Sequence, residues 1–385
     1  METKIVVGIP SFNEADSIGN VVSIIDAGLS KTFMSQECVI VNVDNNSSDG
    51  TRSAFLTTET KCSKHFINTG GENRGKGKNL LSLFGYSHSI GAKVTATFDA
   101  DLLTIEPSWV PNLISPVTDG ACDYVCPLYS RNRFEGSITN HLALPLICAV
   151  FGITIRQPIG GEFALSKEVV DYLLSRTVPP TAFQYGIDIF MTLHSIGGGF
   201  KIGESFLGKK FHKPSFPKIM PMFTQVSQTA LECISSYWRV GHQTVRYINL
   251  KPPSRVGIDD KAMFPHKEKA KKLMADATER FKRLKEEYLF FLEDFYLTIE
   301  RRMLAPEPVF SAEDWSEVLY RFLSKFADGN LTANQRERCG DLLSLIFIRR
   351  AVVFWLEAES MTAQQVECRI IKQAETMRQR FATMQ

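Results

Sequence analysis

The chain has 385 residues, of which 44% are hydrophobic and 22% charged, and its formal net charge at pH 7 is +2. This length allows one large α/β domain with an appendage, or two domains. The composition is ordinary for a soluble globular protein. The small net charge excludes a global attraction to nucleic acid or to anionic membranes, so any anion binding must come from a local site.

Three further features narrow the class of protein. The chain starts directly with a strand-like segment and not with a signal peptide. Its most apolar stretch, residues 142–155, is about 14 residues long and contains Pro145, whereas a membrane span needs roughly 20. Eight cysteines are scattered, and the only close pair, Cys122 and Cys126, has no second pair to complete a zinc site. We therefore expect a buried core helix, reduced cysteines, a cytoplasmic location and no stable membrane span.

The first half alternates short apolar runs typical of strands with segments typical of helices. We expect strands at 5–10, 38–43, 65–68 and 94–98, and helices at 18–29, from about 51, and at 77–90. This alternation predicts an α/β fold with a mostly parallel sheet, covered by helices on both faces. Ligands of such sheets bind beyond the carboxyl ends of the strands, so residues directly after each strand are the functional candidates.

The character of the chain changes after about residue 214. Three prolines interrupt an apolar segment there, which predicts a loop or lid: Pro214, Pro217 and Pro221. From about Gln225 the chain reads as helical. Residues 267–302 carry the apolar stripe of an amphipathic helix, and the same periodicity returns at 315–326, 334–356 and 362–381. We expect a catalytic domain over residues 1–225 and a helical region over residues 226–385.

Two aspartates separated by one residue, Asp99 and Asp101, follow the expected strand at 94–98. They would emerge at the carboxyl edge of the sheet. Mg²⁺ and Mn²⁺ prefer carboxylate oxygens and bridge protein to substrate phosphates. The pair is therefore a candidate for holding a divalent ion and a nucleotide ribose. The alternative is an ordinary acidic turn at a strand end.

Glycines and basic residues are concentrated over residues 70–78, GGENRGKGK. At the start of a helix, backbone N–H groups, the helix dipole and basic side chains together make an anion site. The spacing from Gly70 to Lys76 matches the phosphate-loop pattern, but Gly77 follows where Ser or Thr should bind Mg²⁺. We reject an ATPase or kinase and retain phosphate recognition, with a flexible basic loop as the alternative.

Five other segments carry polar or charged candidate residues. IPSFNE (9–14) and VDNNSSDGT (43–51) could hydrogen-bond a base and ribose, although the same residue types form turns and N-caps. QPIGGEF (157–163) and YGID (185–188) each contain an acid, and Asp188 could equally be a helix cap. In KKFHK (209–213), basic neighbours would keep His212 neutral, as a metal ligand must be.

Taken in order, these segments resemble nucleotide-sugar glycosyltransferases of the GT-A fold, a Rossmann-like α/β fold, here with a C-terminal all-helical extension. The resemblance spans about residues 5–240. It is closest to the retaining glucosyl-3-phosphoglycerate synthases and mannosylglycerate synthases. The segments that carry it are PSFNEADSIG, DNNSSDGT, RGKGKN, FDADLLTIEPSW, QPIGGEFALS, YGIDIFMT and KKFHK.

The resemblance implies a role for each matching position. A divalent ion, Mg²⁺ or Mn²⁺, would be held by Asp101 and His212, while Asp99 would bind the ribose and orient the metal. Lys76 would neutralise the leaving diphosphate. The remaining roles are the nucleobase, framed by Pro10, Phe12, Glu14 and Asp44; the hexose, contacted by Glu162 and Asp188; and the acceptor carboxylate, held by Arg131 and Thr139.

Two departures from the family pattern bear on the acceptor. Residues 136–139 read Gly-Ser-Ile-Thr where phosphoglycerate synthases carry Gly-Arg-x-Thr, and Lys213 stands where an asparagine follows the metal histidine. Both changes remove phosphate contacts, which favours free glycerate, although Arg133 or Lys213 could supply the missing charge.

We therefore predict a metal-dependent retaining transferase that moves glucose or mannose from a UDP- or GDP-sugar to glycerate, 3-phosphoglycerate or a similar small carboxylated acceptor. One alternative is an inverting enzyme of the same fold that acts on a saccharide or lipid acceptor, with Asp188 as base. A second is a non-catalytic nucleotide-binding regulator. The C-terminal helices could form a homodimer surface or a packing brace, and we expect no nucleic-acid partner.

Overall fold

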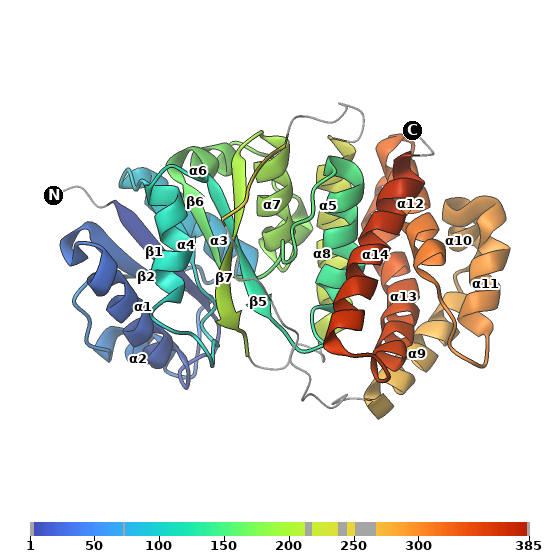
Figure 1. Ribbon diagram of the computed structural model, residues 1–385, viewed down its shortest axis with the longest axis horizontal. Helices are drawn as coiled ribbons and strands as arrows, with labels where there is room; N and C mark the ends of the chain where they lie inside the picture. The colour runs from blue at the N-terminus through green and yellow to red at the C-terminus, as the bar shows by residue number, and fades with distance from the viewer. Residues whose placement is uncertain (1–3, 72–73, 212–217, 238–244, 251–266, 383–385) are drawn as a thin grey trace. The chain divides into compact units, whose positions relative to one another are not determined.

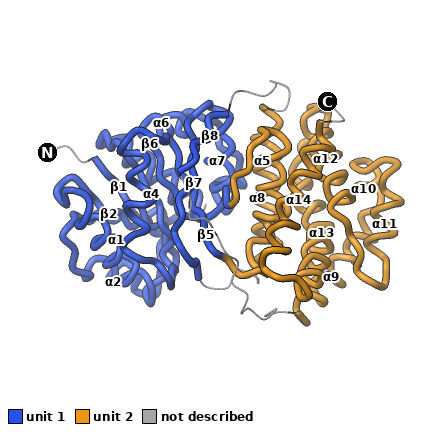
Figure 2. The backbone as a smooth tube through the Cα atoms, viewed as in Figure 1, with its two compact units in different colours: residues 1–130, 157–216, 243–256 blue, residues 131–156, 217–242, 257–385 orange. Residues whose placement is uncertain are grey.

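The computed structural model describes residues 4–71, 74–211, 218–237, 245–250 and 267–382. The chain forms two compact units (Figure 2). The first comprises Met1–Ser130, Gln157–Phe216 and Gln243–Val256, and the second comprises Arg131–Arg156, Pro217–His242 and Gly257–Gln385. The two units therefore differ from the expected division at residue 225. Residues 131–156 belong to the second unit, because the helix at Leu144–Phe151 packs against the helix at Ala363–Ala382.

An eight-stranded sheet forms the centre of the first unit, with the order β3-β2-β1-β4-β6-β5-β7-β8 (Figure 1). Strand β6 is antiparallel to both of its neighbours, and every other pair is parallel. The strands are β1 (Ile5–Ser11), β2 (Cys38–Asp44), β3 (Ser63–Asn68), β4 (Val94–Thr97), β5 (Tyr124–Ser130), β6 (Phe163–Ser166), β7 (Lys201–Lys209) and β8 (Arg246–Ile248).

Helices cover both faces of this sheet. One face is covered by α1 (Ile18–Thr32), α2 (Thr51–Thr57) and α4 (Trp109–Thr118), and the other by α3 (Lys76–Ser89), α6 (Lys167–Leu174) and α7 (Ile187–Gly197). Side chains alternate across a strand, so Val7 packs beneath α1 while Gly8 faces α3. A Cβ at Gly8 would lie 2.1 Å from Leu83 Cδ2, so the close approach of α3 requires a glycine there.

Every strand and helix expected between residues 5 and 98 is present at its expected place. The predicted fold class, a mostly parallel sheet with helices on both faces, is confirmed. The apolar periodicity did not identify the four later strands, or the reversed direction of β6.

The second unit is helical. Residues 142–151 are all buried, which confirms the predicted core helix. In the parts of the chain that the structure describes, no helix is both long and apolar enough to cross a membrane. All eight cysteines are free and seven are buried. The helices are α5 (Leu144–Phe151), preceded by a π-helical turn (Thr139–Ala143), then α8 (Ile219–Ser235), α9 (Lys267–Lys282), α10 (Lys285–Leu292), α11 (Tyr296–Leu304), α12 (Ala312–Ala327), α13 (Ala333–Ala358) and α14 (Ala363–Ala382).

The single amphipathic helix expected over residues 267–302 is wrong, because this region forms α9, α10 and α11. Glu293 has a φ of +51°, which ends α10, since an α-helix requires a negative φ. Phe281, Tyr288 and Phe291, which precede the break, are nevertheless buried in the core. The ring centroids of Phe281 and Tyr288 lie 4.3 Å apart, and Phe291 stacks on Phe322 with ring centroids 4.4 Å apart. Short helices that turn back on each other can bury the same periodic residues as one long helix.

Pro214 and Pro217 lie outside the described residues. Pro221 lies in the first turn of α8, where a missing N–H costs no helical hydrogen bond. The helical region therefore begins at Ile219, earlier than expected.

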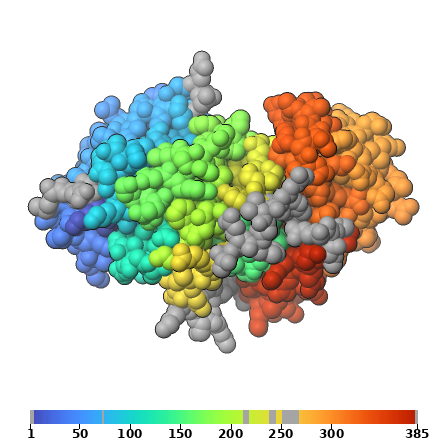
Figure 3. All heavy atoms as spheres, turned by 90° about the horizontal axis from the view of Figure 1, so that it is seen from above, coloured from blue at the N-terminus to red at the C-terminus, as the bar shows by residue number. Residues whose placement is uncertain are grey.

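The surface of the second unit includes α10 and α11, in light orange in Figure 3. Three apolar side chains of these helices are exposed: Phe290, Leu297 and Leu304. The homodimer contact proposed for the helical region stays a prediction.

Candidate active site

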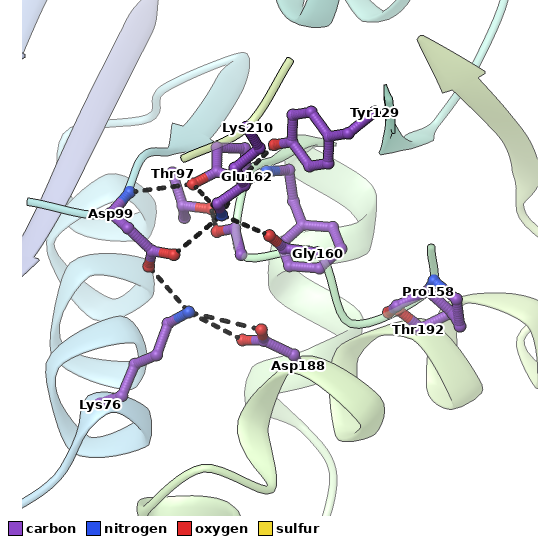
Figure 4. A network of polar contacts seen from close by, with 12 residues as sticks. Lys76, Thr97, Asp99, Tyr129, Pro158, Gly160, Glu162, Asp188, Thr192 and Lys210 are labelled. Carbon is purple, nitrogen blue, oxygen red and sulfur yellow. Dashed lines mark hydrogen bonds and ion pairs between the residues drawn. The ribbon is translucent and has the colours of Figure 1, made fainter. Parts of the chain in front are cut away.

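Five charged side chains of the first unit meet where β4 and its neighbours end (Figure 4). Asp99 follows β4, Glu162 precedes β6 and Lys210 follows β7. Lys76 is the first residue of α3 and Asp188 the second residue of α7. The structure therefore brings together four residues predicted from the sequence and one that was not predicted, Lys210.

The ammonium group of Lys76 lies between two carboxylates. Its Nζ is 2.9 Å from Asp99 Oδ1 and 3.3 Å from Asp188 Oδ1, and the side chain is 18% exposed. Burial disfavours the charged form, but Asp188 and Asp99 outweigh that cost, so the pKa of Lys76 is raised. Lys76 is therefore positively charged at every physiological pH.

The position of Lys76 is set by the segment that leads into α7. Gly77 N donates to Gln184 O at 3.0 Å, and the Gln184 side-chain amide donates to Arg74 O. A Cβ at Gly77 would lie 1.8 Å from Ala182 O. Because the same segment carries Asp188, one tight backbone contact positions both partners of the ion pair.

We predict that Gly77→Ala lowers the free energy of unfolding by about 1–3 kcal/mol, because the added methyl group must push the backbone of residue 182 away. Gly85→Ala is the matched control on the same helix, since a Cβ there meets nothing within 4 Å. It should raise stability by roughly 0.5–1 kcal/mol. Chemical denaturation measures both, and equal stability of the two variants would contradict the tight contact.

Beneath Asp99 lies a buried ion pair between Glu162 and Lys210. Glu162 is completely buried and Lys210 is 3% exposed, with Nζ 2.7 Å from Glu162 Oε2 and 2.9 Å from Oε1. Tyr129 donates its hydroxyl to Glu162 Oε2. Burial raises the pKa of Glu162, while the charge of Lys210 opposes that rise. The hexose contact predicted for Glu162 stays a prediction.

Asp188 is not a simple helix cap, because Gly186 occupies the N-cap position of α7. Its carboxylate lies in the first turn, where the helix dipole favours negative charge. Burial nevertheless raises its pKa, Lys76 lowers it, and Asp99 raises it further. The net direction is upward, so the folded state carries the Asp188 carboxylate at a cost.

We predict that Asp188→Asn raises the melting temperature at pH 7. A raised acid pKa means that the folded state binds more protons than the unfolded state, so stability is lost as pH rises from about 3.8 through the folded pKa. Asparagine cannot ionise and so avoids this loss of stability. The loss amounts to about 1.4 kcal/mol of unfolding free energy for each pH unit between the unfolded-state and folded-state pKa values of Asp188. The gain should therefore disappear in melting curves recorded below pH 3.8.

Asp171→Asn is the control of opposite sign. Lys167 and His88 lower the pKa of Asp171 at the surface, so this change should slightly reduce stability at pH 7. A fall in stability for both variants at pH 7 would contradict the assignment for Asp188.

The loops predicted to frame a nucleobase are tied together by hydrogen bonds. Asn13 N donates to Ser47 Oγ and Glu14 N donates to Thr51 Oγ1, both at 2.8 Å. Phe12 is 48% exposed at the tip of the first loop, and Pro10 is partly buried. The structure thus brings the ends of β1 and β2 together, and contact with a base stays a prediction.

Asp44 is deeply buried within the second loop. Its Oδ1 accepts from Ser11 Oγ at 2.8 Å and from Ser47 Oγ at 2.6 Å, and its Oδ2 accepts from Ser47 N at 2.7 Å. These bonds order the turn after β2. Glu14 therefore lies at a more accessible place than Asp44 for reading a base edge.

The predicted metal ligands are only partly visible. His212 lies outside the described residues, and no group of three His, Cys, Asp or Glu side chains suited to a metal occurs among those that are described. Both carboxylate oxygens of Asp99 contact lysines, whereas Asp101 is partly exposed on the turn after β4. One or two carboxylates completed by substrate phosphates suit Mg²⁺ or Mn²⁺, so Asp101 is compatible with such an ion, and the metal site of Asp101 and His212 stays a prediction.

The predicted acceptor residues Arg131 and Thr139 belong to the second unit, with Thr139 buried at the start of the π-helical turn. Arg133 Nη1 donates to Met361 O at 2.5 Å and to Ala358 O at 3.4 Å. A cation is favourable there, at the carboxyl end of α13. The acceptor roles of Arg131 and Thr139 stay predictions.

Sequence reasoning missed Lys210 and Tyr129. Lys210 stands in KKFHK, where a second lysine looks like one more solvated charge, and the histidine drew the functional assignment. Tyr129 lies on β5 without any neighbouring motif. Only the pairing of β5 with β6 and β7 shows that both residues surround Glu162.

Part of the chain matches a known protein family, and its fold is similar to that of solved structures. Residues 6–164 match the model of glycosyl transferase family 2, and no curated protein sequence matches the chain significantly. A solved structure of glucosyl-3-phosphoglycerate synthase from Mycobacterium tuberculosis with Mn²⁺, UDP and phosphoglyceric acid is similar at 22% identity and a TM-score of 0.49, covering 66% of this chain and 82% of that chain. A structure described as a mycobacterial protein is similar at 24% identity and a TM-score of 0.50, covering 60% and 74%.

The fold and the match of residues 6–164 to glycosyl transferase family 2 support a sugar-nucleotide-dependent glycosyltransferase of the GT-A fold, as the sequence predicted. The family match covers residues 6–164, which is less than half of the chain. The likeness to the mycobacterial protein is one of fold. The matched region contains Lys76, Asp99 and Glu162, while Asp188 and Lys210 follow it.

Proposed function

We propose that this enzyme transfers glucose or mannose from a UDP- or GDP-sugar to glycerate, 3-phosphoglycerate or a similar small carboxylated acceptor, with Mg²⁺ or Mn²⁺ and with retention of the anomeric configuration. The observation that carries the proposal is the ammonium group of Lys76, held between Asp99 and Asp188 at the carboxyl edge of the sheet. A nucleotide diphosphate binds at this edge in folds of this kind.

Breaking the anomeric bond builds negative charge on the departing diphosphate. Lys76 has three N–H donors and two carboxylate partners, one of them at 3.3 Å, so it can turn a proton toward a phosphate oxygen. A positioned charge of this kind stabilises the transition state. Asp101 and His212 would hold the divalent ion, which when bound adds further neutralisation of the diphosphate. Asp99 would bind the ribose.

The same bond cleavage builds positive charge on the hexose, and the carboxylate of Asp188 would face it. In the retaining mechanism, the acceptor hydroxyl attacks from the face that the diphosphate leaves. The departing phosphate oxygen takes the hydroxyl proton, so the mechanism needs no protein base. This agrees with the engagement of Asp188 by Lys76.

The acceptor carboxylate would be held by Arg131 and Thr139. Arg133, a candidate for binding an acceptor phosphate, already donates to two backbone carbonyls at the end of α13. This engagement supports free glycerate over 3-phosphoglycerate.

The test is a matrix of UDP- and GDP-sugars against glycerate, 3-phosphoglycerate and similar acids, with Mn²⁺ or a chelator. Solved glucosyl-3-phosphoglycerate synthase structures hold UDP-glucose and phosphoglyceric acid, so that pair is assayed first. We expect turnover with one base and a carboxylated acceptor, and loss of turnover with chelator. Metal-independent binding of nucleotide sugars in calorimetry, with no turnover of any small acceptor, would instead indicate the regulator.

An inverting transferase with Asp188 as base is the second candidate, favoured by one observation. Asp188 Oδ1 is buried and accepts no hydrogen bond from the described residues, although it forms the ion pair with Lys76. Digestion of the isolated product with α- and β-specific glycosidases separates the two mechanisms. Because the donors are α-linked, retention requires an α product, and a β product would assign Asp188 as the base.

A further inference from the structure

We propose that Lys210 and Glu162 form a buried positioning pair that orients the carboxylate of Asp99 toward Lys76 and does not itself bind substrate, a role that replaces the hexose contact predicted for Glu162 from the sequence. The catalytic consequence rests on the proposed function, whereas the contacts that define the pair do not. The pair lies beside Asp99 in Figure 4 and joins the ends of β4, β6 and β7.

The hydrogen-bonding capacity of Lys210 is fully used within the protein. An ammonium group has three N–H donors. Around Nζ lie four acceptors, namely Glu162 Oε2 and Gly160 O at 2.7 Å, Glu162 Oε1 at 2.9 Å and Asp99 Oδ2 at 3.3 Å. Nζ also lies 5.3 Å from the centre of the Tyr129 ring. With 3% of the side chain exposed, no donor is available to a phosphate.

Lys76 differs from Lys210 in its exposure and in the partners of its ammonium group. Its side chain is 18% exposed, and the contacts of its Nζ, at 2.9 and 3.3 Å, are to the two aspartates that flank the site. The two lysines thus contact opposite oxygens of Asp99, Lys76 at Oδ1 and Lys210 at Oδ2. This places Lys76 on the substrate side of Asp99 and Lys210 on the interior side.

Glu162 also contacts Asp99 directly, at the backbone N–H of Asp99. Its Oε1 accepts from Asp99 N at 3.4 Å, while Oε2 accepts from the Tyr129 hydroxyl and from Lys210. A completely buried carboxylate is costly unless it is paired and hydrogen-bonded. The cost is met here by an arrangement that fixes both the main chain and the side chain of Asp99.

Gly161, in the loop before β6, packs closely against the contact between Asp99 and Lys210. Its φ is +99°, and a Cβ there would lie 2.3 Å from Asp99 Oδ2 and 3.1 Å from Lys210 Nζ. The loop is fastened to β4 because Thr97 Oγ1 donates to Gly161 O and accepts from Phe163 N, both at 3.2 Å. A side chain at position 161 would therefore separate Asp99 from Lys210 without removing any charge.

The first test is a double-mutant cycle of Glu162→Gln and Lys210→Met. Lys210→Met leaves the buried Glu162 without its cation, and Glu162→Gln leaves the buried Lys210 with only the longer, 3.3 Å contact to Asp99 as an ion pair. Each single change should therefore lower the melting temperature by about 5–15 °C. The double variant has no unpaired charge, so it should regain most of that loss. Calorimetry with Mn²⁺ and UDP or GDP should nevertheless show at least tenfold weaker nucleotide binding than wild type. Lys210→Arg should restore part of that binding.

A double variant with wild-type stability and wild-type nucleotide binding would overturn the proposal, as would melting temperatures that simply add. If wild type binds neither nucleotide, the proposed function fails, and the melting-temperature cycle alone decides whether the pair exists.

The second test keeps every charge and uses Gly161→Ala. Its matched control is Gly199→Ala, because Gly199 has a φ of +76° but a Cβ there meets nothing within 4 Å. Both variants carry similar backbone strain. We expect only Gly161→Ala to weaken nucleotide binding, by tenfold or more, and equal binding by the two variants would overturn the positioning role.

Discussion

Replacing Lys76 with methionine is expected to lower kcat about 10²–10³-fold while changing the melting temperature little. Methionine keeps the length of the side chain and removes the charge that would meet the diphosphate. Removing one such stabilising group costs about 2.7–4 kcal/mol in the transition state. Asp188, whose pKa is already raised by burial, can take up a proton when its partner is lost, so the fold should tolerate the change. Steady-state kinetics with the preferred donor measures the effect.

Lys167→Met is the matched control, because Lys167 also pairs with an aspartate, Asp171, but at the surface of α6. It should retain wild-type kcat. An equal loss of kcat in both variants, or unchanged kcat in Lys76→Met, would contradict the role given to Lys76.

Asp101→Ala is expected to abolish metal-dependent turnover, at least 10³-fold below wild type, while the protein stays folded. Asp101 is partly exposed on the turn after β4, so its loss creates no cavity in the core. Without this carboxylate, the ion that neutralises the diphosphate would lose one of its few protein ligands. Titration with Mn²⁺ followed by calorimetry measures the lost affinity, and melting curves verify the fold. His212→Ala should behave in the same way.

Asp119→Ala removes an exposed carboxylate at the end of α4 and serves as the control, with Mn²⁺ affinity and turnover expected to match wild type. Full activity of Asp101→Ala and of His212→Ala at low metal concentration would contradict the assigned metal site.

Much of the first unit was predictable because its elements are local. The alternation of apolar runs located the first four strands, and strand ends located Asp99, Asp101 and Asp44. Parallel strands place their carboxyl ends at one edge, so the sequence predicted that these side chains would gather there. Lys76 and Asp188 followed from helix starts at the same edge.

Local patterns could not predict features that depend on distant segments. The broken helix region at residue 293 keeps its apolar periodicity, so the break becomes visible only through the backbone of Glu293. The reversed strand β6 is short and pairs with β4 and β5, and the nearest paired residues, Val125 and Ala164, are 39 positions apart along the chain. Strand direction is therefore decided by pairing and not by composition.

The sequence by itself determined the fold class, the sheet edge and the motifs that bear charge, because periodicity and strand ends are written within a few neighbouring residues. The tertiary structure alone decided which charges meet. Glu162 and Lys210 are 48 residues apart, and each would be too costly to bury singly. Their pairing, and with it the orientation of Asp99, exists only once β4, β6 and β7 have come together.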